Sequence, residues 1–323
     1  MPPPHNGNAL SNMILNLLQE WGIDKKIFTM TLDNASANDR CAELVKQKLN
    51  IKKALLCEGE FLHLRCCAHI LNLIVQDGLR EIDDVIEKVR DSVKYVRGSQ
   101  GRKQKFLEAV KQVSLDSHKG LKQDVPTRWN STYLMLESAI YYRSAFSYLE
   151  ITDSNYKHCP SAVEWEKVDN IRSFLACFYE ATCVFSGTKY PTANLYFPVI
   201  AMIYVSLKEE LMGEDEHKKL MATKMISKFE KYWFEFSEAL AIAVILDPRY
   251  KLHLVNYYYT KIYGVMDSIQ FENVREKLKS LFMEYSASSN TSSSSSITSQ
   301  QPQVPRAKLA WQKVNNIINF LPS

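Results

Sequence analysis

Asp33 is the first residue in the sequence whose type and setting could support chemistry. It lies in Thr31-Leu-Asp-Asn-Ala-Ser-Ala-Asn-Asp39, at the end of a predicted short strand and just before a predicted helix. In α/β folds, carboxylates at this position can bind metal ions. The same pattern also suits a turn residue or a helix cap. A two-metal site needs two or three convergent carboxylates, and the sequence near Asp33 supplies no evident second one.

A cysteine and a histidine with the spacing of metal ligands come next. In Arg65-Cys-Cys-Ala-His69, Cys66 and His69 are three residues apart, so they share one face of a predicted helix. Two such ligands are half of a zinc site, and His63 is the nearby candidate for a third. No second Cys/His pair with finger-like spacing follows. We therefore predict no metal site here, and a structural role for a buried cysteine and a hydrogen-bonded histidine.

The third cluster is Asp124-Val-Pro-Thr-Arg-Trp-Asn-Ser131. Pro126 keeps the residue before it extended, so Arg128 and Trp129 should lie where a loop enters a helix. An arginine beside an exposed tryptophan can hold a phosphate and stack on an unpaired base. The alternative is a tryptophan packed in the core beside a solvated arginine.

The positive charge of the chain is concentrated between Lys88 and Lys111. The whole chain has a net charge of +4, whereas this segment holds eight basic and two acidic residues. Such clustering is what a phosphate-binding surface needs, and a solvated helix face has the same composition. The basic residues are Lys88, Arg90, Lys94, Arg97, Arg102, Lys103, Lys105 and Lys111.

Composition indicates that helices position these residues. The 323 residues include only 10 Gly and 11 Pro, a combined share well below the usual value of roughly 12%. With 46% apolar and 24% charged residues, the chain is globular. Seven Cys, an odd number in a chain too large to need disulfides, indicate a reduced intracellular setting. Neither a signal peptide nor an apolar run of the roughly 18 residues that span a membrane is evident.

The spacing of apolar residues along the sequence predicts where the strands and helices lie. Alternation predicts strands over 26–32 and 61–66, and Ser36-x-x-Asp39 is a capping-box pattern that predicts a helix over 36–49. An apolar stripe from Ile82 to Val96 predicts a helix with Arg90 mostly facing away from the core. The segment 239–246 fits a helix or a strand. A helix is predicted over 8–21, a second one begins after residue 66, and a separate basic helix ends at about residue 113. Further helices are predicted over 131–149, 162–186, 195–212, 217–236, 250–259 and 271–285.

Taken in order, the three clusters resemble motifs of the hAT transposase superfamily. Their residues are most similar to those of the plant domesticated members called RICESLEEPER and DAYSLEEPER. The segments are 28–38, 66–72 and 126–132, joined by a similar downstream stretch over 228–263. The resemblance covers residues 1–285 and implies an RNase H-like catalytic core interrupted by a large helical insertion. It implies that Asp33 matches the second carboxylate of the acidic triad and that Cys66 and His69 match a Cys-x-x-His near the active site. It also implies that Trp129 stacks on a displaced base at the transposon end.

The sequence departs from that family pattern in what surrounds the clusters. We expect the first triad aspartate on a strand before the opening of this chain, and the triad glutamate in a segment after the insertion that is missing here. The family's N-terminal zinc finger, which recognises DNA, is expected to be absent. The C-terminal dimerisation region is also expected to be absent, except for the segment around Trp311 that leads into it. With one carboxylate of three, we expect no two-metal phosphodiester chemistry and no cofactor, since Mg²⁺ would be expected only for an intact triad.

The predicted fold is mixed α/β and predominantly helical. It comprises a partial RNase H-like core over 1–80, an all-α insertion over 81–285, a Ser-rich disordered linker over 286–305, and the start of a missing C-terminal segment over 306–323. Residue 80 is thus the predicted boundary between core and insertion.

The predicted function is that of a transposase-derived, catalytically inactive nuclear protein that binds DNA weakly and mostly without sequence preference. Further partners would be a second copy or related transposase-like proteins, and no membrane. The alternative is a helical module that binds other transposase-derived proteins and does not touch DNA. Exposed, contiguous basic residues and an exposed Trp129 favour DNA, whereas paired basic residues and a buried Trp129 favour the module. The predicted DNA-binding residues are Arg128, Trp129, Lys88, Arg90, Lys94, Arg97, Arg102, Lys103 and Lys105.

Overall fold

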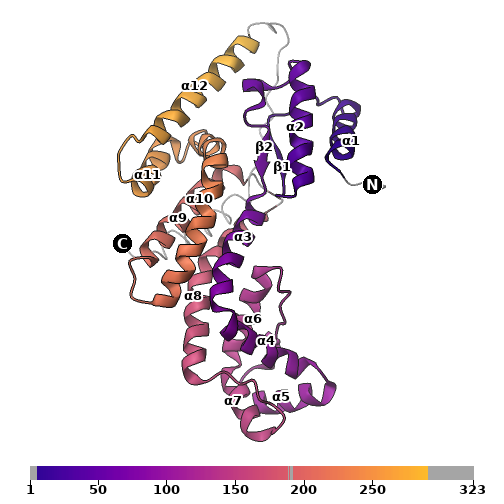
Figure 1. Cartoon of the computed structure of the whole chain (residues 1–323), viewed down its shortest axis with the longest axis vertical. Helices are drawn as coiled ribbons and strands as arrows, with labels where there is room; N and C mark the ends of the chain where they lie inside the picture. Colours follow the sequence, from indigo (N-terminus) through magenta and orange to yellow (C-terminus); the bar gives the residue numbers. More distant parts are fainter. Residues whose placement is uncertain (1–5, 188, 190–191, 290–323) are drawn as a thin grey trace. The chain divides into compact units, whose positions relative to one another are not determined.

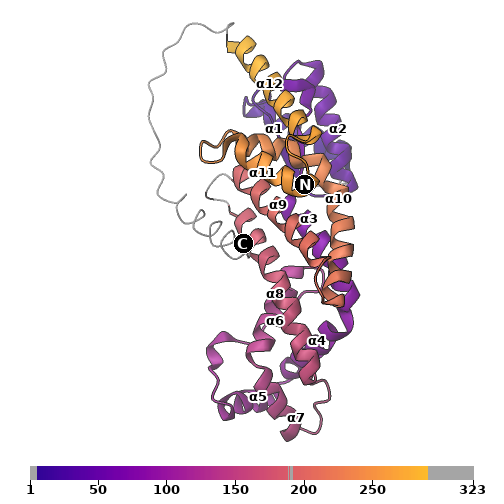
Figure 2. The ribbon, with the colours of Figure 1, turned by 90° about the vertical axis from the view of Figure 1, so that its left-hand side faces the viewer.

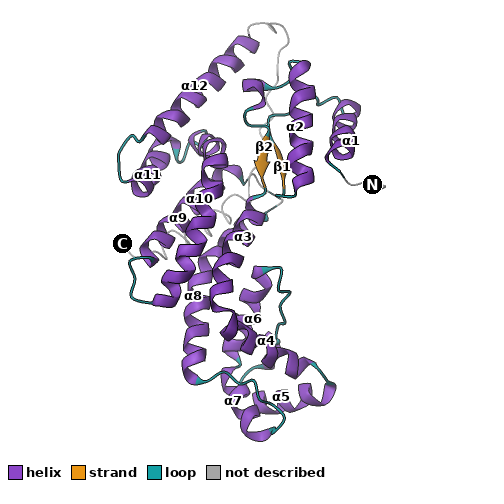
Figure 3. Cartoon of the chain, in the orientation of Figure 1, coloured by secondary structure: helices purple, strands orange, loops and turns teal. Residues whose placement is uncertain are grey.

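The computed structural model describes residues 6–187, 189 and 192–289, which form helices and one small sheet (Figures 1 and 3). The fold is therefore mixed α/β and predominantly helical, as predicted. In this described part of the chain, no helix is both long and apolar enough to cross a membrane. The last described helix, α12 (Ile269–Ser289), runs four residues into the predicted linker. The rest of the linker and the segment 306–323 lie outside the described residues.

Contacts divide the chain into two compact units. Unit 1 is Met1–Ile70, Val184–Val205 and Glu230–Ser323, and unit 2 is Leu71–Cys183 and Ser206–Phe229. Four of the helices contribute residues to both units: α3 (Cys67–Leu79), α8 (Ala162–Phe185), α9 (Ala193–Glu210) and α10 (Glu216–Ile245). The boundary predicted at residue 80 remains a prediction, because a unit defined by contacts need not coincide with an inserted domain.

Unit 1 contains the sheet. Strand β1 (Met30–Leu32) pairs in parallel with β2 (His63–Arg65), so that Leu32 lies opposite Arg65 (orange in Figure 3). Helices α1 (Gly7–Glu20) and α2 (Ser36–Ile51) pack against each other beside it (Figure 1). Their apolar stripes meet because residues three and four apart share a helix face. The buried residues of this core are Leu15, Leu18, Cys41, Val45, Leu49, Leu55 and Leu62.

The later segments of unit 1 pack through aromatic side chains. The Trp233 ring lies 5.7 Å from Phe197 and 6.0 Å from Tyr204, and its Nε1 donates to the Tyr263 hydroxyl at 2.9 Å. These residues join α9, α10 and α11 (Lys251–Tyr263). Helix α12 packs on α11 and on the short 3-10 helix η1 (Leu56–Gly59), where Lys277 forms an ion pair with Glu60.

Asp247 closes the corner between α10 and α11. Its carboxylate accepts from Arg249 and from Asn194 Nδ2, and the hydrogen bonds from Arg249 lower the pKa of Asp247 to about 2. The backbone N–H groups of Tyr250 and Lys251 donate to the Asp247 carbonyl. The Leu-Asp-Pro-Arg-Tyr stretch is therefore a stable turn between two helices.

Unit 2 is all-helical within the described residues. After the 3-10 helix η2 (Arg80–Ile82) come α4 (Asp83–Arg97), α5 (Gln100–Gln112), α6 (Trp129–Tyr141) and α7 (Arg143–Thr152), followed by most of α8. The predicted stripe of α4 is buried, with Val89 and Val93 fully inaccessible. Helix α5 packs on α7, as Figures 1 and 2 both show, and its Phe106 ring lies 5.0 Å from Phe146. A single-turn 3-10 helix, η3 (Ser117–Lys119), lies in the loop before α6.

Three local predictions differ from the structure. The strands are shorter than predicted because only three residues of each find a partner on the other. The N-cap of α2 is Ala35, not Ser36, and makes no side-chain cap bond because its methyl group has no acceptor. The Ala35 N–H donates to Asp33 Oδ1. The helix predicted over 131–149 is two helices, since Tyr142 leaves helical geometry at φ −95° and ψ 13°. The ambiguous segment 239–246 is the last part of α10 as far as Ile245.

Candidate functional site

Asp33 and the Cys-x-x-His cluster meet at one edge of the small sheet in unit 1. Cys66 N–H donates to the Leu32 carbonyl at 2.6 Å, so the residues after the two parallel strands lie next to each other. Asp33 is exposed and accepts from the Ala35 N–H at 3.0 Å and from Asn38 Nδ2 at 2.6 Å. The bond from Ala35 lowers the pKa of Asp33, and the nearby His69 acts in the same direction. The structure therefore brings two of the three sequence clusters together.

This edge does not fit a two-metal site. Within the described residues, no group of three or more His, Cys, Asp or Glu side chains could hold a metal ion. The Asp33 carboxylate already accepts hydrogen bonds from Ala35 N–H and Asn38 Nδ2 in the turn before α2. Burial raises the pKa of the neighbouring Cys67 thiol to about 12, so this thiol is neutral in the folded chain. We derive no metal-dependent step, and the structural role of Cys66 and His69 remains a prediction.

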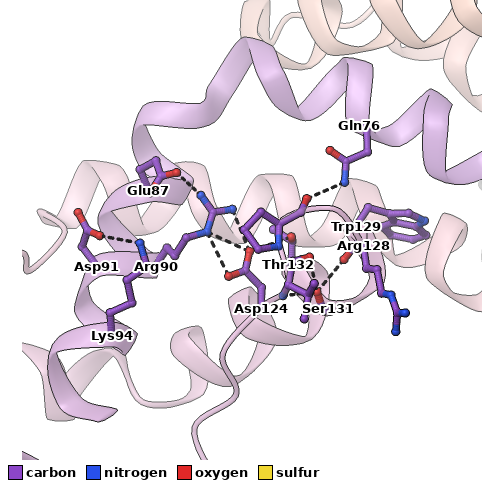
Figure 4. Close-up of polar contacts among 12 residues, drawn as sticks. Gln76, Glu87, Arg90, Asp91, Lys94, Asp124, Arg128, Trp129, Ser131 and Thr132 are labelled. Carbon is purple, nitrogen blue, oxygen red and sulfur yellow. Dashed lines mark hydrogen bonds and ion pairs between the residues drawn. The ribbon is translucent and has the colours of Figure 1, made fainter. Parts of the chain in front are cut away.

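Trp129 corrects the expectation of an exposed stacking residue. It is the first residue of α6, only 1% exposed, and its ring packs edge-on against Tyr133 at 6.5 Å. Its backbone N–H donates to Asn72 Oδ1 at 3.3 Å. Gln76 Nε2 donates to the Pro126 carbonyl at 2.9 Å (Figure 4). A large apolar ring contributes most to folding when it is buried. The expectation that Trp129 is exposed is therefore wrong, and its burial disfavours stacking on a base.

Arg90 is the second residue whose predicted position is wrong, because the helical period predicted its side chain on the solvent side of α4. The structure leaves it 7% exposed and pairs it with Asp124 through two guanidinium nitrogens, at 2.8–3.1 Å (Figure 4). Glu87 accepts from a further nitrogen, and Thr132 Oγ1 donates to Asp124 at 3.1 Å. Burial alone would lower the pKa of Arg90, but the two carboxylates outweigh it and raise the pKa. Arg90 is a buried structural ion pair and cannot contact a phosphate.

Three other predicted phosphate ligands also have acidic partners. Lys88 bonds Glu164 at 2.7 Å, and this contact is the main cause that lowers the pKa of Glu164 to about 2. Lys105 bonds the buried Asp153 at 3.1 Å. Lys94 lies 3.4 Å from Asp91, with both side chains about half exposed. The basic segment is therefore less positive in the folded protein than in the sequence.

The remaining basic residues of the segment are exposed cations. No ion pair with a described residue is formed by Arg97, Arg102, Lys103 or Lys111. The same holds for Lys119 in η3 and Arg128 before α6. Lys103 and Lys111 are eight residues apart on α5 and share a face, and η3 packs on the same helix. Arg102 stacks over the Tyr95 ring at 4.2 Å. We call Arg97, Arg102, Lys103, Lys111 and Lys119 the α5 basic surface.

Sequence reasoning missed the residues that support the third cluster. Asn72 and Gln76 were not assigned a role, although they are four residues apart on one helix, a spacing that places two polar groups on one face. Lys119 was missed because it lies beyond the segment in which charge was counted. No signal in the sequence linked Arg90 to Asp124, which lies 34 residues away.

Comparisons with known proteins find matching families over most of the chain. Residues 1–61 match the family model of the ZBED1 RNase-like domain, residues 64–174 that of the ZBED1 RNase-like helical domain, and residues 194–285 that of the hAT-like transposase with an RNase-H fold. The zinc finger BED domain-containing protein RICESLEEPER 2 of Oryza sativa subsp. japonica is 39% identical over 285 residues, which is 88% of this chain and 40% of that protein. DAYSLEEPER of Arabidopsis thaliana is 33% identical over 284 residues, 88% of this chain and 41% of its own length. The chain thus spans about two fifths of these relatives.

Proposed function

The chain belongs to the hAT-like transposase family, and from this premise we propose that it binds DNA through the α5 basic surface without cleaving it. The buried Trp129 and the four paired cations meet the criterion given above for the interaction module. The DNA proposal therefore rests on one observation: the other cations of the basic segment stay exposed on α5 and its immediate neighbours. Unpaired cations on a helix face are suited to phosphates, because each contact releases a condensed counterion. We also propose a nuclear location, since DNA is the ligand.

The chemistry of this surface supports weak binding with little sequence preference. Long basic side chains on an exposed face contact the phosphate backbone, which carries no sequence information. Four or five contacts give an affinity that falls steeply with salt, by roughly 0.9 logarithmic units per contact for each tenfold rise in salt concentration. Arg128 adds a cation on the same unit.

A titration of labelled duplex at two salt concentrations tests this proposal. The variant Arg102→Gln, Lys103→Gln, Lys111→Gln should weaken binding at low salt and reduce the salt slope by about 3, without changing any sequence preference. A matched control, Lys25→Gln, Lys26→Gln, Lys53→Gln, removes the same charge from exposed positions in unit 1. If both variants bind like the wild type, or if the wild type binds no DNA at low salt, the proposal fails. The protein-interaction module would then take its place.

The second part of the proposal, the absence of cleavage, rests on the donor set around Asp33. We expect purified protein with Mg²⁺ or Mn²⁺ to leave supercoiled and linear DNA intact, because two-metal chemistry needs convergent carboxylates. A gel assay of nicking and strand joining measures this. Metal-dependent cleavage that is abolished in Asp33→Ala, and retained in Asp24→Ala, a change at a half-buried carboxylate outside the cluster, would contradict the proposal.

A further inference from the structure

A groove of about 480 Å³ lies in unit 1, between α12 and the corner where α10 leads into α11. Its apolar walls are open to solvent: Phe282 is 71% exposed, Leu246 67% and Leu252 36%. Leu278 also lines the groove and is half-buried. These side chains present faces that another apolar surface can cover, and the burial of apolar area is the main favourable contribution to association.

The rim of the groove is charged but has no dominant sign. Arg275 lines it and forms an ion pair with Glu272 of the same helix at 2.7 Å. Glu276 and Lys279 also line it, are exposed, and form no ion pair with a described residue. The groove therefore favours an apolar stripe with polar flanks, such as one face of an amphipathic helix, over a ligand of one charge.

The sequence contains such a stripe in the segment 306–323, which lies outside the described residues. Trp311, Val314 and Ile318 have the spacing i, i+3 and i+7 that is typical of helices that bind in grooves. At helical spacing, Ala307 and Leu321 extend the same face. The residues that would flank this stripe are polar, namely Lys308, Gln312, Asn315 and Asn319.

We propose that residues 306–321 dock in this groove of their own chain, with their apolar stripe against its open apolar walls. The proposal does not depend on DNA binding, because no residue of the α5 basic surface lines the groove.

The length of the intervening chain fits this arrangement. Helix α12 ends at Ser289, seven residues or about 10 Å along the helix beyond Phe282. A Ser-rich chain of 16 residues, the length of 290–305, has a mean span of about 20–24 Å and can return to the groove. The stripe from Trp311 to Ile318 and the wall from Arg275 to Phe282 each cover seven residue steps, about 10 Å in helical geometry.

The covalent connection favours this segment over a free partner. A short linker holds the segment near the groove at an effective concentration on the order of 1 mM. An intrinsic dissociation constant of roughly 0.1 mM would then give a docked to undocked ratio of about ten. A second copy at micromolar concentration would leave the same groove mostly empty.

Hydrogen exchange of the full chain, followed by mass spectrometry of peptides from 306–321, tests the proposal. Phe282→Lys and Leu246→Lys each place a charge on an open apolar wall of the groove. Ile51→Lys is the matched control, because Ile51 is 83% exposed in the same unit and does not line the groove. A further variant, Trp311→Ser with Ile318→Ser, removes the stripe from the segment itself.

We expect the amides of this segment to exchange about tenfold more slowly in the wild type and in Ile51→Lys than in a free peptide of the same sequence. The protection should not depend on protein concentration, and both groove variants and the stripe variant should lose it. Absence of protection in the wild type, or its retention in both groove variants, overturns the proposal. Protection that rises with protein concentration, together with dimers in sedimentation, assigns the groove to a second copy and also overturns it. None of these results alters the outcome expected of the DNA titration.

Discussion

Replacement of Asp124 by alanine is expected to lower the free energy of unfolding by about 3–5 kcal/mol, because it leaves the buried Arg90 guanidinium without its main counter-charge. The Asp124 side chain is 1% exposed, and that of Arg90 is 8% exposed. Thr132 loses its acceptor at the same time. Urea denaturation followed by circular dichroism measures the change.

The matched control for this prediction is Asp91→Ala on the same helix. Its partner Lys94 lies 3.4 Å away and is 51% exposed, so solvent screens the pair and the loss should stay below about 1 kcal/mol. Equal effects of the two substitutions would contradict the structural role of the Arg90–Asp124 pair. A double variant, Arg90→Met with Asp124→Leu, should recover much of the stability, since it removes both charges from the interior.

Trp129→Ala is expected to have a comparable effect, about 3–5 kcal/mol of lost stability, because it removes a fully buried indole and leaves a cavity. Trp129→Phe should lose less, since the phenyl ring still fills most of the site. Any loss of DNA binding in Trp129→Ala should follow the fraction of folded protein. The measurement is a urea titration run in parallel with DNA binding on the same samples.

Trp21→Ala is the control for the tryptophan. Trp21 is 64% exposed at the end of α1, so its replacement should change stability by no more than about 0.5 kcal/mol. A Trp129→Ala protein that folds like the wild type but loses affinity for single-stranded DNA would restore the stacking role that the burial of this residue excludes.

The sequence predicted helix positions well where burial follows a local period. The stripe on α4 is an example: Val89 and Val93 are inaccessible, as the spacing of three and four residues requires. The same period placed Arg90 toward solvent and was wrong. Its position is decided by Asp124, which lies in a loop 34 residues later, and no local pattern contains that information.

A count of charges within one segment of the sequence has the same limitation, because it omits acidic residues that lie elsewhere in the chain. The segment 88–111 is strongly basic by composition, but Glu164 and Asp153, which neutralise Lys88 and Lys105, lie outside it. The strand predicted over 26–32 was similarly limited, because β2 offers partners for only three residues. Long-range pairing therefore sets the part of the candidate site that the sequence could not predict.

The loop before α6 has a consequence for how Arg128 could meet an anion. Arg128 N–H donates to the Val125 carbonyl at 2.8 Å, and its own carbonyl accepts from Ser131 N–H at 2.9 Å and from Ser131 Oγ at 2.7 Å. Folding has thus already restricted the backbone torsions at this position. If DNA binds as proposed, a contact between Arg128 and a phosphate costs only the conformational entropy of the side-chain rotamers, which is less than the cost of ordering a free loop. Arg128 is therefore preorganised for an encounter even though the indole beside it is not available.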